Sequence, residues 1–227
     1  MRARLVEWVE LAPLTRQFTF EAEQALEFVP GQFVSLVGQN GEKTITRAYS
    51  IASPPAGKRF DLCLNLVEDG TFTPLLFGMS PGDEVEYKGP YGVFVFRNPL
   101  SDSILVATGT GITPFRSMLQ ERLPRERERQ FTLVFGARHE HGLLYKAEFE
   151  ELAAKYPNFR FVPTLTRPGA SWTGLSGRVH AHIDLELGAR RDIDVYICGM
   201  AEMVNELRST LKEKGLDRKR IIVEKYD

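Results

Sequence analysis

The sequence predicts two successive architectures: an antiparallel assembly of about six short strands, followed by a parallel, doubly wound α/β sheet of about five strands. Turn signals divide the first 98 residues into short strand-like runs. After Asn98, apolar runs instead alternate with segments of helical periodicity. We therefore expect two domains, residues 1–98 and 99–227.

The first part is divided by pairs such as Pro30-Gly31, Asp69-Gly70 and Gly89-Pro90. Turns at this spacing are typical of antiparallel strands in a barrel or a sandwich. The expected strands are residues 2–11, 16–21, 33–37, 45–51, 60–67 and 84–88. A short helix is expected over 73–79, with Thr73 as its cap and Pro74 at its first position.

The second part alternates strands with helices. The expected strands are 104–107, 131–135, 159–163, 195–198 and 221–224, and the expected helices are 114–122, 146–156, 180–187 and 201–214. This order predicts a parallel sheet whose ligand crevice lies at the carboxyl ends of its strands. Residues 109–113 and 198–199 fall at those ends.

The glycine turn after the strand 104–107 is the first candidate site. Gly109 and Gly111 let the backbone approach a phosphate closely, and Thr113 and Pro114 suit the cap and first position of a helix. Unpaired amide groups and the helix dipole favour an anion there. An ordinary tight turn could use the same residues, so the surrounding pattern decides between the two.

Composition excludes several classes of protein. The net charge of −1 does not suggest non-specific nucleic-acid binding, and no apolar run is long enough to span a bilayer. The two cysteines are too few for an iron–sulfur cluster, and no metal site is expected. His180 and His182 are expected in solvated positions near a helix start. A cytoplasmic protein is the default for this composition.

A second candidate site lies in the first part. Arg47 and Tyr49 share one face of a strand, where a guanidinium can bind a phosphate and a phenol ring can lie against a planar heterocycle. Alternation places Ser50 on the opposite face, so the strand must end or bulge there for its hydroxyl to reach the same ligand. The alternative is a barrel strand whose tyrosine covers the core.

Arg47-x-Tyr49-Ser50-x-x-Ser53 resembles the flavin signature of the ferredoxin–NADP reductase superfamily, and further motifs follow in that family's order. The resemblance covers nearly the whole chain. It is carried also by Gly70-Thr-Phe-Thr73, Gly89-Pro-Tyr-Gly92, Gly109-Thr-Gly-Ile-Thr-Pro114, Cys198-Gly-Met200 and Glu224-Lys-Tyr226. It implies an antiparallel six-stranded, flavin-binding β-barrel followed by a five-stranded parallel, doubly wound α/β domain for the nicotinamide nucleotide.

The resemblance also implies site residues. Arg47 would bind the flavin phosphate, Tyr49 would stack on the flavin ring, and Ser50, Cys198 and Glu224 would be catalytic. The residues implied for FAD are Arg47, Ala48, Tyr49, Ser50, Ser53, Asn65, Leu66, Val67, Gly70, Thr71, Phe72, Thr73, Thr110 and Tyr226. Those implied for NADP are Gly109, Thr110, Gly111, Ile112, Thr113, Pro114, Cys198, Gly199, Met200 and Met203.

Three further residues bear on the choice of nucleotide. Arg138, and Thr166 with Arg167, follow the second and third strands of the α/β part, where the adenosine end should lie. Two arginines there favour the 2′-phosphate of NADP(H), although surface arginines are common and NAD(H) remains possible. FAD is expected in preference to FMN because the family usually holds FAD.

We therefore expect a flavoprotein reductase that passes hydride between NAD(P)H and FAD and exchanges electrons with a separate carrier, such as a ferredoxin or flavodoxin. The alternatives are an NADH-dependent reductase component of an oxygenase, a free-flavin reductase, and a nucleotide-binding adaptor subunit without turnover. The sequence leaves open the electron acceptor, the direction of electron flow and the oligomeric state.

Overall fold

The structure, a computed structural model, describes residues 1–226 apart from the side chain of Asn40. The chain divides into two compact units. The first comprises Met1–Phe96 together with Thr113–Arg122, and the second comprises Arg97–Ile112 together with the chain from Leu123 onward. The boundary between residues 98 and 99 therefore stays a prediction, because a helix beyond it groups with the first unit.

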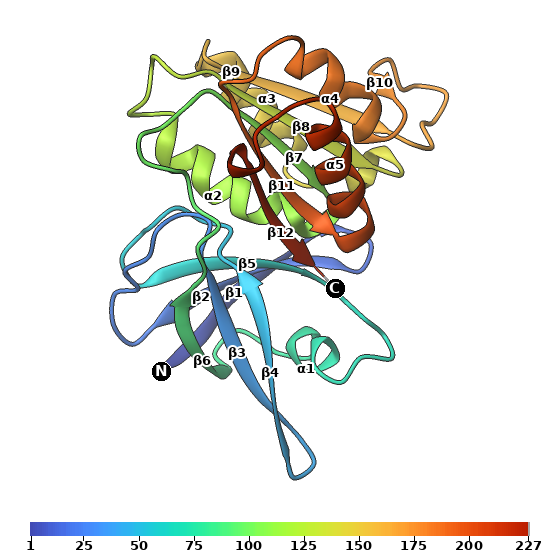
Figure 1. Ribbon diagram of the computed structural model, residues 1–227. Coiled ribbons are helices and arrows are strands. Elements are labelled where there is room, and N and C mark those ends of the chain that lie inside the picture. Colours follow the sequence, from blue (N-terminus) through green and yellow to red (C-terminus); the bar gives the residue numbers. More distant parts are fainter. Residues whose placement is uncertain (227) are drawn as a thin grey trace. The chain divides into compact units, whose positions relative to one another are not determined.

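The first unit is an antiparallel six-stranded sheet with two helices (Figure 1). Its elements are β1 (Arg2–Ala12), β2 (Thr15–Ala22), β3 (Phe33–Asn40), β4 (Lys43–Ser50), β5 (Arg59–Asn65), α1 (Thr73–Phe77), β6 (Glu84–Tyr91) and α2 (Thr113–Arg122). The strand order is β4-β3-β6-β1-β2-β5. A bridge between Ile51 and Leu62 joins the chain after β4 to β5, the two edge strands, as the predicted barrel requires.

Alternation along the strands builds the core of this unit, because every second side chain of a strand points to the same face. The inward side chains of β2, β3 and β5 have no exposed surface and form one apolar cluster: Phe18, Phe20, Val34, Leu36, Phe60 and Leu62. Leu76 of α1 joins the same cluster, so the short helix is packed onto the sheet.

Helix α1 differs from the predicted helix over 73–79. It covers Thr73–Phe77, its cap residue is Phe72, and Thr73 is already helical. The Thr73 hydroxyl does not cap the helix because the preceding loop uses it: the Val67 amide donates to Thr73 Oγ1 at 2.8 Å.

The second unit is a parallel sheet with the order β10-β9-β8-β7-β11-β12. Its strands are β7 (Ser103–Thr108), β8 (Phe131–Ala137), β9 (Phe159–Leu165), β10 (Leu175–Ser176), β11 (Asp194–Met200) and β12 (Ile221–Tyr226). Its helices are α3 (Lys146–Lys155), α4 (Val179–Leu187) and α5 (Ala201–Glu213), with 3₁₀ turns η1 (Gly109–Ile112), η2 (Glu140–Gly142) and η3 (Arg218–Arg220).

The predicted doubly wound sheet is confirmed, but it has six strands instead of five. The additional strand, β10, has two exposed residues that pair with Thr164 and Leu165 of β9. Such a strand carries no apolar run, so periodicity could not indicate it.

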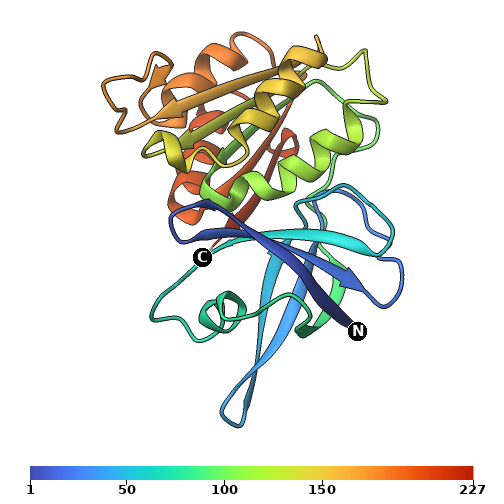
Figure 2. The same cartoon turned by 180° about the vertical axis from the view of Figure 1, so that it is seen from behind.

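The central strands β7, β8 and β11 are buried along almost their whole length, as their apolar runs predict. Helices α4 and α5 pack together on one face of the sheet through Ile183, Leu187, Val204 and Leu207. Helix α3 covers the opposite face, which is turned to the viewer in Figure 2.

Helix α2 begins at Thr113, one residue before the predicted start. The predicted cap at Thr113 is wrong because the 3₁₀ turn Gly109–Ile112 leads straight into the helix, so Thr113 already has helical backbone.

Between residues 1 and 226, the structure contains no helix with the length and hydropathy needed to cross a membrane.

Candidate functional site

Strand β4 carries Arg47 and Tyr49 on one face, opposite Leu36 and Val34 of β3. The Arg47 side chain is exposed and donates to the carbonyl oxygen of Thr46 at 3.0 Å. Tyr49 is half-buried, and burial raises the pKa of its phenol to about 12 against the opposing effect of the Arg47 charge. The face therefore offers a cation beside a phenol ring that is neutral at physiological pH.

Ser50 lies on the other face, opposite Phe33, and is the last residue of β4. The strand ends where the sequence analysis requires an end for the Ser50 hydroxyl to turn toward the same ligand. Beyond it, the Ile51 amide donates to the carbonyl oxygen of Gln32 at 3.0 Å. Ser50 and Ser53 are both buried, so this segment is fixed and not an exposed loop.

The loop from Asn65 to Thr73 is tightly bonded to itself and to its surroundings. The Leu66 amide donates to Leu14 at 2.7 Å, and the Gly70 amide donates to Val67 at 2.8 Å. A Cβ at Gly70 would lie 2.8 Å from the Val67 carbonyl oxygen, so this tight turn requires glycine. The amides of Leu66 and Val67 and the Val67 carbonyl oxygen are thus already used within the protein.

The Phe72 side chain lies in the barrel core. Its ring stacks on the Tyr49 ring at a centroid distance of 6.2 Å. The structure thus brings together β4 and the Gly70–Thr73 segment, two stretches that the sequence analysis assigns to FAD. An exposed guanidinium, a neutral aromatic ring and a polar backbone loop in one unit fit a flavin nucleotide. Of the other residues assigned to FAD, Thr110 and Tyr226 belong to the second unit.

In the second unit, the glycine turn meets the end of β11. A Cβ at Gly111 would lie 2.4 Å from the Cys198 carbonyl oxygen, and one at Gly199 would lie 2.8 Å from Met203 Cε. Gly109 has a φ of +55° and nothing within 4 Å of its Cβ position. Strands β7 and β11 are neighbours at the point where the strand order reverses, which is where open α/β sheets bind ligands.

Thr108 is a candidate that the sequence analysis missed. Its Oγ1 is buried and, within residues 1–226, has no hydrogen-bond partner. It lies 2.6 Å from the Cβ position of Gly199, beside the glycine turn. The sequence did contain a signal for it, because Thr108 is a polar residue directly after the apolar run 104–107. A buried hydroxyl without a partner, next to a glycine turn with one open side, fits a polar ligand such as a dinucleotide.

Cys198 and Glu224 are cross-strand neighbours on β11 and β12, and Met200 pairs with Tyr226 two residues further on. Burial raises the pKa of the Cys198 thiol well above its usual value, and the Glu224 charge adds to this, while a hydrogen bond from Tyr226 opposes it. Cys198 is therefore a protonated thiol at neutral pH and not a thiolate nucleophile.

Arg138 and Arg167 lie side by side at the carboxyl ends of β8 and β9. The Arg167 amide donates to the Arg138 carbonyl oxygen at 2.8 Å, and the Thr166 amide donates to Ala137 at 3.0 Å. Both arginine side chains are exposed. The structure thus brings the backbones of two arginines together at the edge where the sequence analysis expects the adenosine end of the nucleotide.

The expectation of a solvated His182 is wrong. This residue is 8% exposed, and its Nε2 lies 2.9 Å from Thr164 Oγ1 and 3.1 Å from the Ser176 carbonyl oxygen. Helix α4 begins at Val179, so His182 falls on its buried side with Val179 and Ile183. In the described part of the chain, no three His, Cys, Asp or Glu residues form a group that could hold a metal ion.

Two family models match successive parts of the chain. The family described as "Oxidoreductase FAD-binding domain" matches residues 2–96, and "Oxidoreductase NAD-binding domain" matches residues 105–209. The chain is 41% identical to ferredoxin–NADP reductase B of Sorangium cellulosum over 237 aligned residues, which cover 99% of this chain and 97% of that protein.

Two other relatives bear on function. The reductase component of phenol 2-monooxygenase from a Pseudomonas species is 35% identical, and the match covers 96% of this chain but only 63% of that protein. A crystal structure of a ferredoxin–NADP⁺ reductase from Neisseria gonorrhoeae with bound FAD and NADP superposes with a TM-score of 0.87 at 26% identity, over 99% of this chain and 98% of that one.

A match over nearly the full length of both proteins, on the predicted pair of folds, settles the family. The chain belongs to the ferredoxin–NADP reductase family of flavoproteins and is an oxidoreductase that binds FAD and a nicotinamide dinucleotide.

Proposed function

We propose that this protein transfers hydride between NADP(H) and bound FAD and exchanges electrons with a separate carrier, such as a ferredoxin or flavodoxin. The observation that carries the proposal is the 41% identity to a ferredoxin–NADP reductase, which extends over 97% of that relative. We assign FAD to residues 1–98 and the nicotinamide nucleotide to residues 99–227, and we expect the protein in the cytoplasm.

In the flavin site, bound FAD supplies the redox chemistry, and the chain supplies position and polarity. The exposed Arg47 guanidinium is suited to a charge-assisted contact with a flavin phosphate. The Tyr49 ring, whose pKa is raised to about 12, stays neutral and can lie against a planar ring. The Ser50 hydroxyl is assigned to a hydrogen bond with the reactive edge of the flavin.

In the nucleotide site, the turn Gly109–Ile112 and Thr108 Oγ1 are suited to the pyrophosphate. Cys198 presents a protonated, uncharged thiol next to the Glu224 carboxylate. We assign these two side chains to catalytic positions that flank the path of the hydride beside the nicotinamide ring. Thr166 and the Arg138–Arg167 pair are assigned to the adenosine end.

The choice of NADP(H) is supported by the two neighbouring arginines, which can bind a 2′-phosphate. It is tested by measuring kcat/KM for NADPH and NADH in the wild type, Arg138→Ala and Arg167→Ala. Each substitution should lower kcat/KM for NADPH by about 10- to 150-fold, the effect of one charge-assisted hydrogen bond. Values for NADH should change little.

The matched control is Arg218→Ala, because η3 precedes β12 and so lies at the opposite ends of the strands. NADH preference in the wild type, unchanged by both test substitutions, would refute the assignment.

A yellow preparation that NADPH bleaches under anaerobic conditions supports the enzyme, whereas bound flavin that no nicotinamide nucleotide reduces supports the adaptor alternative.

A second candidate function is the reductase component of an oxygenase. The 35% identity to the phenol 2-monooxygenase reductase component favours it, although the chain spans only 63% of that relative. The discriminating experiment assays the purified protein with a panel of acceptors: ferredoxins, flavodoxins, free flavins and oxygenase components. Rapid reduction of a ferredoxin or flavodoxin supports the first proposal, and selective reduction of an oxygenase component supports the second.

A further inference from the structure

Helix α2 is held by side chains of the barrel. The Phe115 and Phe94 rings lie 5.7 Å apart between centroids. Met118 Sδ lies 3.3 Å from the Cβ position of Gly31, a residue whose φ of +103° leads the chain into β3. These contacts explain why α2 groups with the first unit although it follows the glycine turn in sequence.

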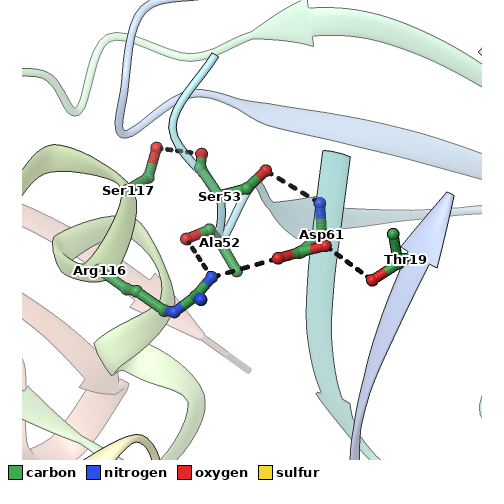
Figure 3. Close-up of polar contacts among 6 residues, drawn as sticks. All are labelled: Thr19, Ala52, Ser53, Asp61, Arg116 and Ser117. Carbon is green, nitrogen blue, oxygen red and sulfur yellow. Dashed lines mark hydrogen bonds and ion pairs between the residues drawn. The ribbon is translucent and has the colours of Figure 1, made fainter. Parts of the chain in front are cut away.

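Arg116 and Asp61 form a largely buried ion pair between α2 and β5 (Figure 3). Arg116 Nη1 donates to Asp61 Oδ2 at 3.2 Å and to the Ala52 carbonyl oxygen at 3.1 Å. The other carboxylate oxygen of Asp61 accepts from Thr19 Oγ1 at 2.8 Å. The two charged side chains are only 12% and 16% exposed, so the pair is shielded from solvent screening.

Ser53 is fixed by the same two elements. Its carbonyl oxygen accepts from Ser117 Oγ of α2 at 2.6 Å, and its Oγ accepts from the Asp61 amide of β5 at 3.0 Å (Figure 3). The Ala52 amide also donates to the Asp61 carbonyl oxygen at 2.8 Å. The segment Ala52–Ser53 is thus held from both sides.

The segment Ala52–Ser53 begins two residues after Ser50, the last residue of β4. Regular ladder pairing ends at Ser50, so the direction of the chain there depends on contacts outside the ladder. Ile51 is held by Gln32 and by its bridge to Leu62, and the next residue, Ala52, is held by the Asp61 backbone and the Arg116 guanidinium. Only Ile51 separates Ala52 from Ser50 in the chain, so the Arg116 contact acts on the backbone close to the Ser50 hydroxyl.

We propose that Arg116 is a positioning residue for the flavin site: with Asp61 as its counter-charge, it holds Ala52–Ser53 and thereby sets the orientation of Ser50 toward bound FAD. The inference rests on the proposed flavin-binding role of Ser50. It assigns Arg116 no contact with FAD. It requires that loss of the Arg116 contact to Ala52 changes FAD affinity and flavin potential, beyond any loss of stability.

The experiment compares four variants with the wild type: Arg116→Met, Arg116→Lys, the double variant Arg116→Met/Asp61→Asn, and the control Arg4→Met. Arg4 forms a 2.9 Å ion pair with Glu21 in the same unit but is 58% exposed, so its loss should matter little. FAD binding to apoprotein is measured by flavin fluorescence, the midpoint potential by anaerobic titration, and stability by urea unfolding of the apoprotein.

Arg116→Met should weaken FAD binding about tenfold or more and shift the midpoint potential, with partial recovery in Arg116→Lys, whose ammonium can still donate. The double variant distinguishes a loss of FAD affinity from a loss of stability. Its asparagine side chain keeps an oxygen for the Thr19 hydroxyl without the unpaired buried charge, so stability should return toward wild type. FAD affinity should stay low, because no donor then holds the Ala52 carbonyl oxygen.

The inference is overturned if the double variant recovers FAD affinity and potential together with stability, since the pair would then be merely structural. It is also overturned if Arg116→Met binds FAD as Arg4→Met does. In both cases the proposed function survives, provided that the wild type binds FAD and NADPH reduces it. A wild-type protein that takes up no FAD would overturn the proposed function and the inference together.

Discussion

Replacement of Gly111 by alanine tests the glycine turn of the second unit most directly. The added Cβ would lie 2.4 Å from the Cys198 carbonyl oxygen, 2.6 Å from its carbon and 2.8 Å from the Gly199 Cα. All three atoms belong to the backbone of the central strand β11, so no side-chain rotation can relieve the overlap. The turn must move away from β11.

The size of the effect follows from this geometry. Forcing one extra carbon into a packed interior costs about 1–3 kcal/mol. If the displaced turn is the pyrophosphate site, the same displacement should weaken nucleotide binding by about 5- to 150-fold. Gly169→Ala is the matched control, because a Cβ at Gly169 meets nothing within 4 Å and the residue has no positive φ.

The assay is isothermal titration of each purified variant with NADP⁺, together with urea unfolding. We expect weaker nucleotide binding and lower stability for Gly111→Ala, and wild-type values for Gly169→Ala. Equal dissociation constants for the two variants would show that the turn does not bind the nucleotide. Equal stabilities would show that the turn is not pressed against β11 as the distances indicate.

Three more predictions follow from single residues. Arg47→Ala should weaken FAD binding by about 1.5–3 kcal/mol, the value of a charge-assisted hydrogen bond, and unchanged affinity in a fluorescence titration would show that Arg47 does not bind the flavin phosphate. Tyr226→Ser should change the KM for the nicotinamide nucleotide if its ring covers the flavin, and identical kinetics would remove that role. Tyr196→Phe should cost about 1–3 kcal/mol in urea unfolding, because the buried hydroxyl accepts from the Arg97 amide at 3.0 Å and the variant leaves that donor unpaired.

The protonation state of Cys198 adds a dependence of stability on pH. Its pKa is raised in the folded protein, so above about pH 8.5, the ordinary thiol value, the unfolded chain loses this proton while the folded chain keeps it. The folded state then binds more protons, and the free energy of unfolding falls as pH rises. Cys198→Ala should therefore show a flatter decline than the wild type between about pH 8 and 10.

Most of the fold could be predicted because its signals are local. The buried strands β7, β8 and β11 are short apolar runs, and glycine and proline mark the turns of the barrel, so their bounds differ from prediction by only a few residues. The errors occur where a tertiary contact overrides a local preference. Thr73 looks like a helix cap, yet its hydroxyl is bonded to the Val67 amide.

The candidate site could be predicted to the extent that its residues form contiguous motifs, as at Arg47–Ser50 and Gly109–Thr113. Thr108 and His182 were missed or misread because their importance depends on burial. The unpaired state of Thr108 Oγ1 and the contact of His182 with Thr164 arise only when the sheet has formed. Neither is encoded in spacing along the chain.

Helix α2 shows that the position of an element in the chain does not predict the compact unit to which it belongs. By sequence it begins the α/β part, directly after the glycine turn. Arg116 and Asp61 are 55 positions apart, and Ser117 and Ser53 are 64 apart, yet they form buried contacts within one unit. The energy of such a contact depends on burial and geometry, not on separation along the chain. Helix α2, which directly follows the glycine turn in sequence, is therefore anchored on β5 and on the segment after β4, within the first unit.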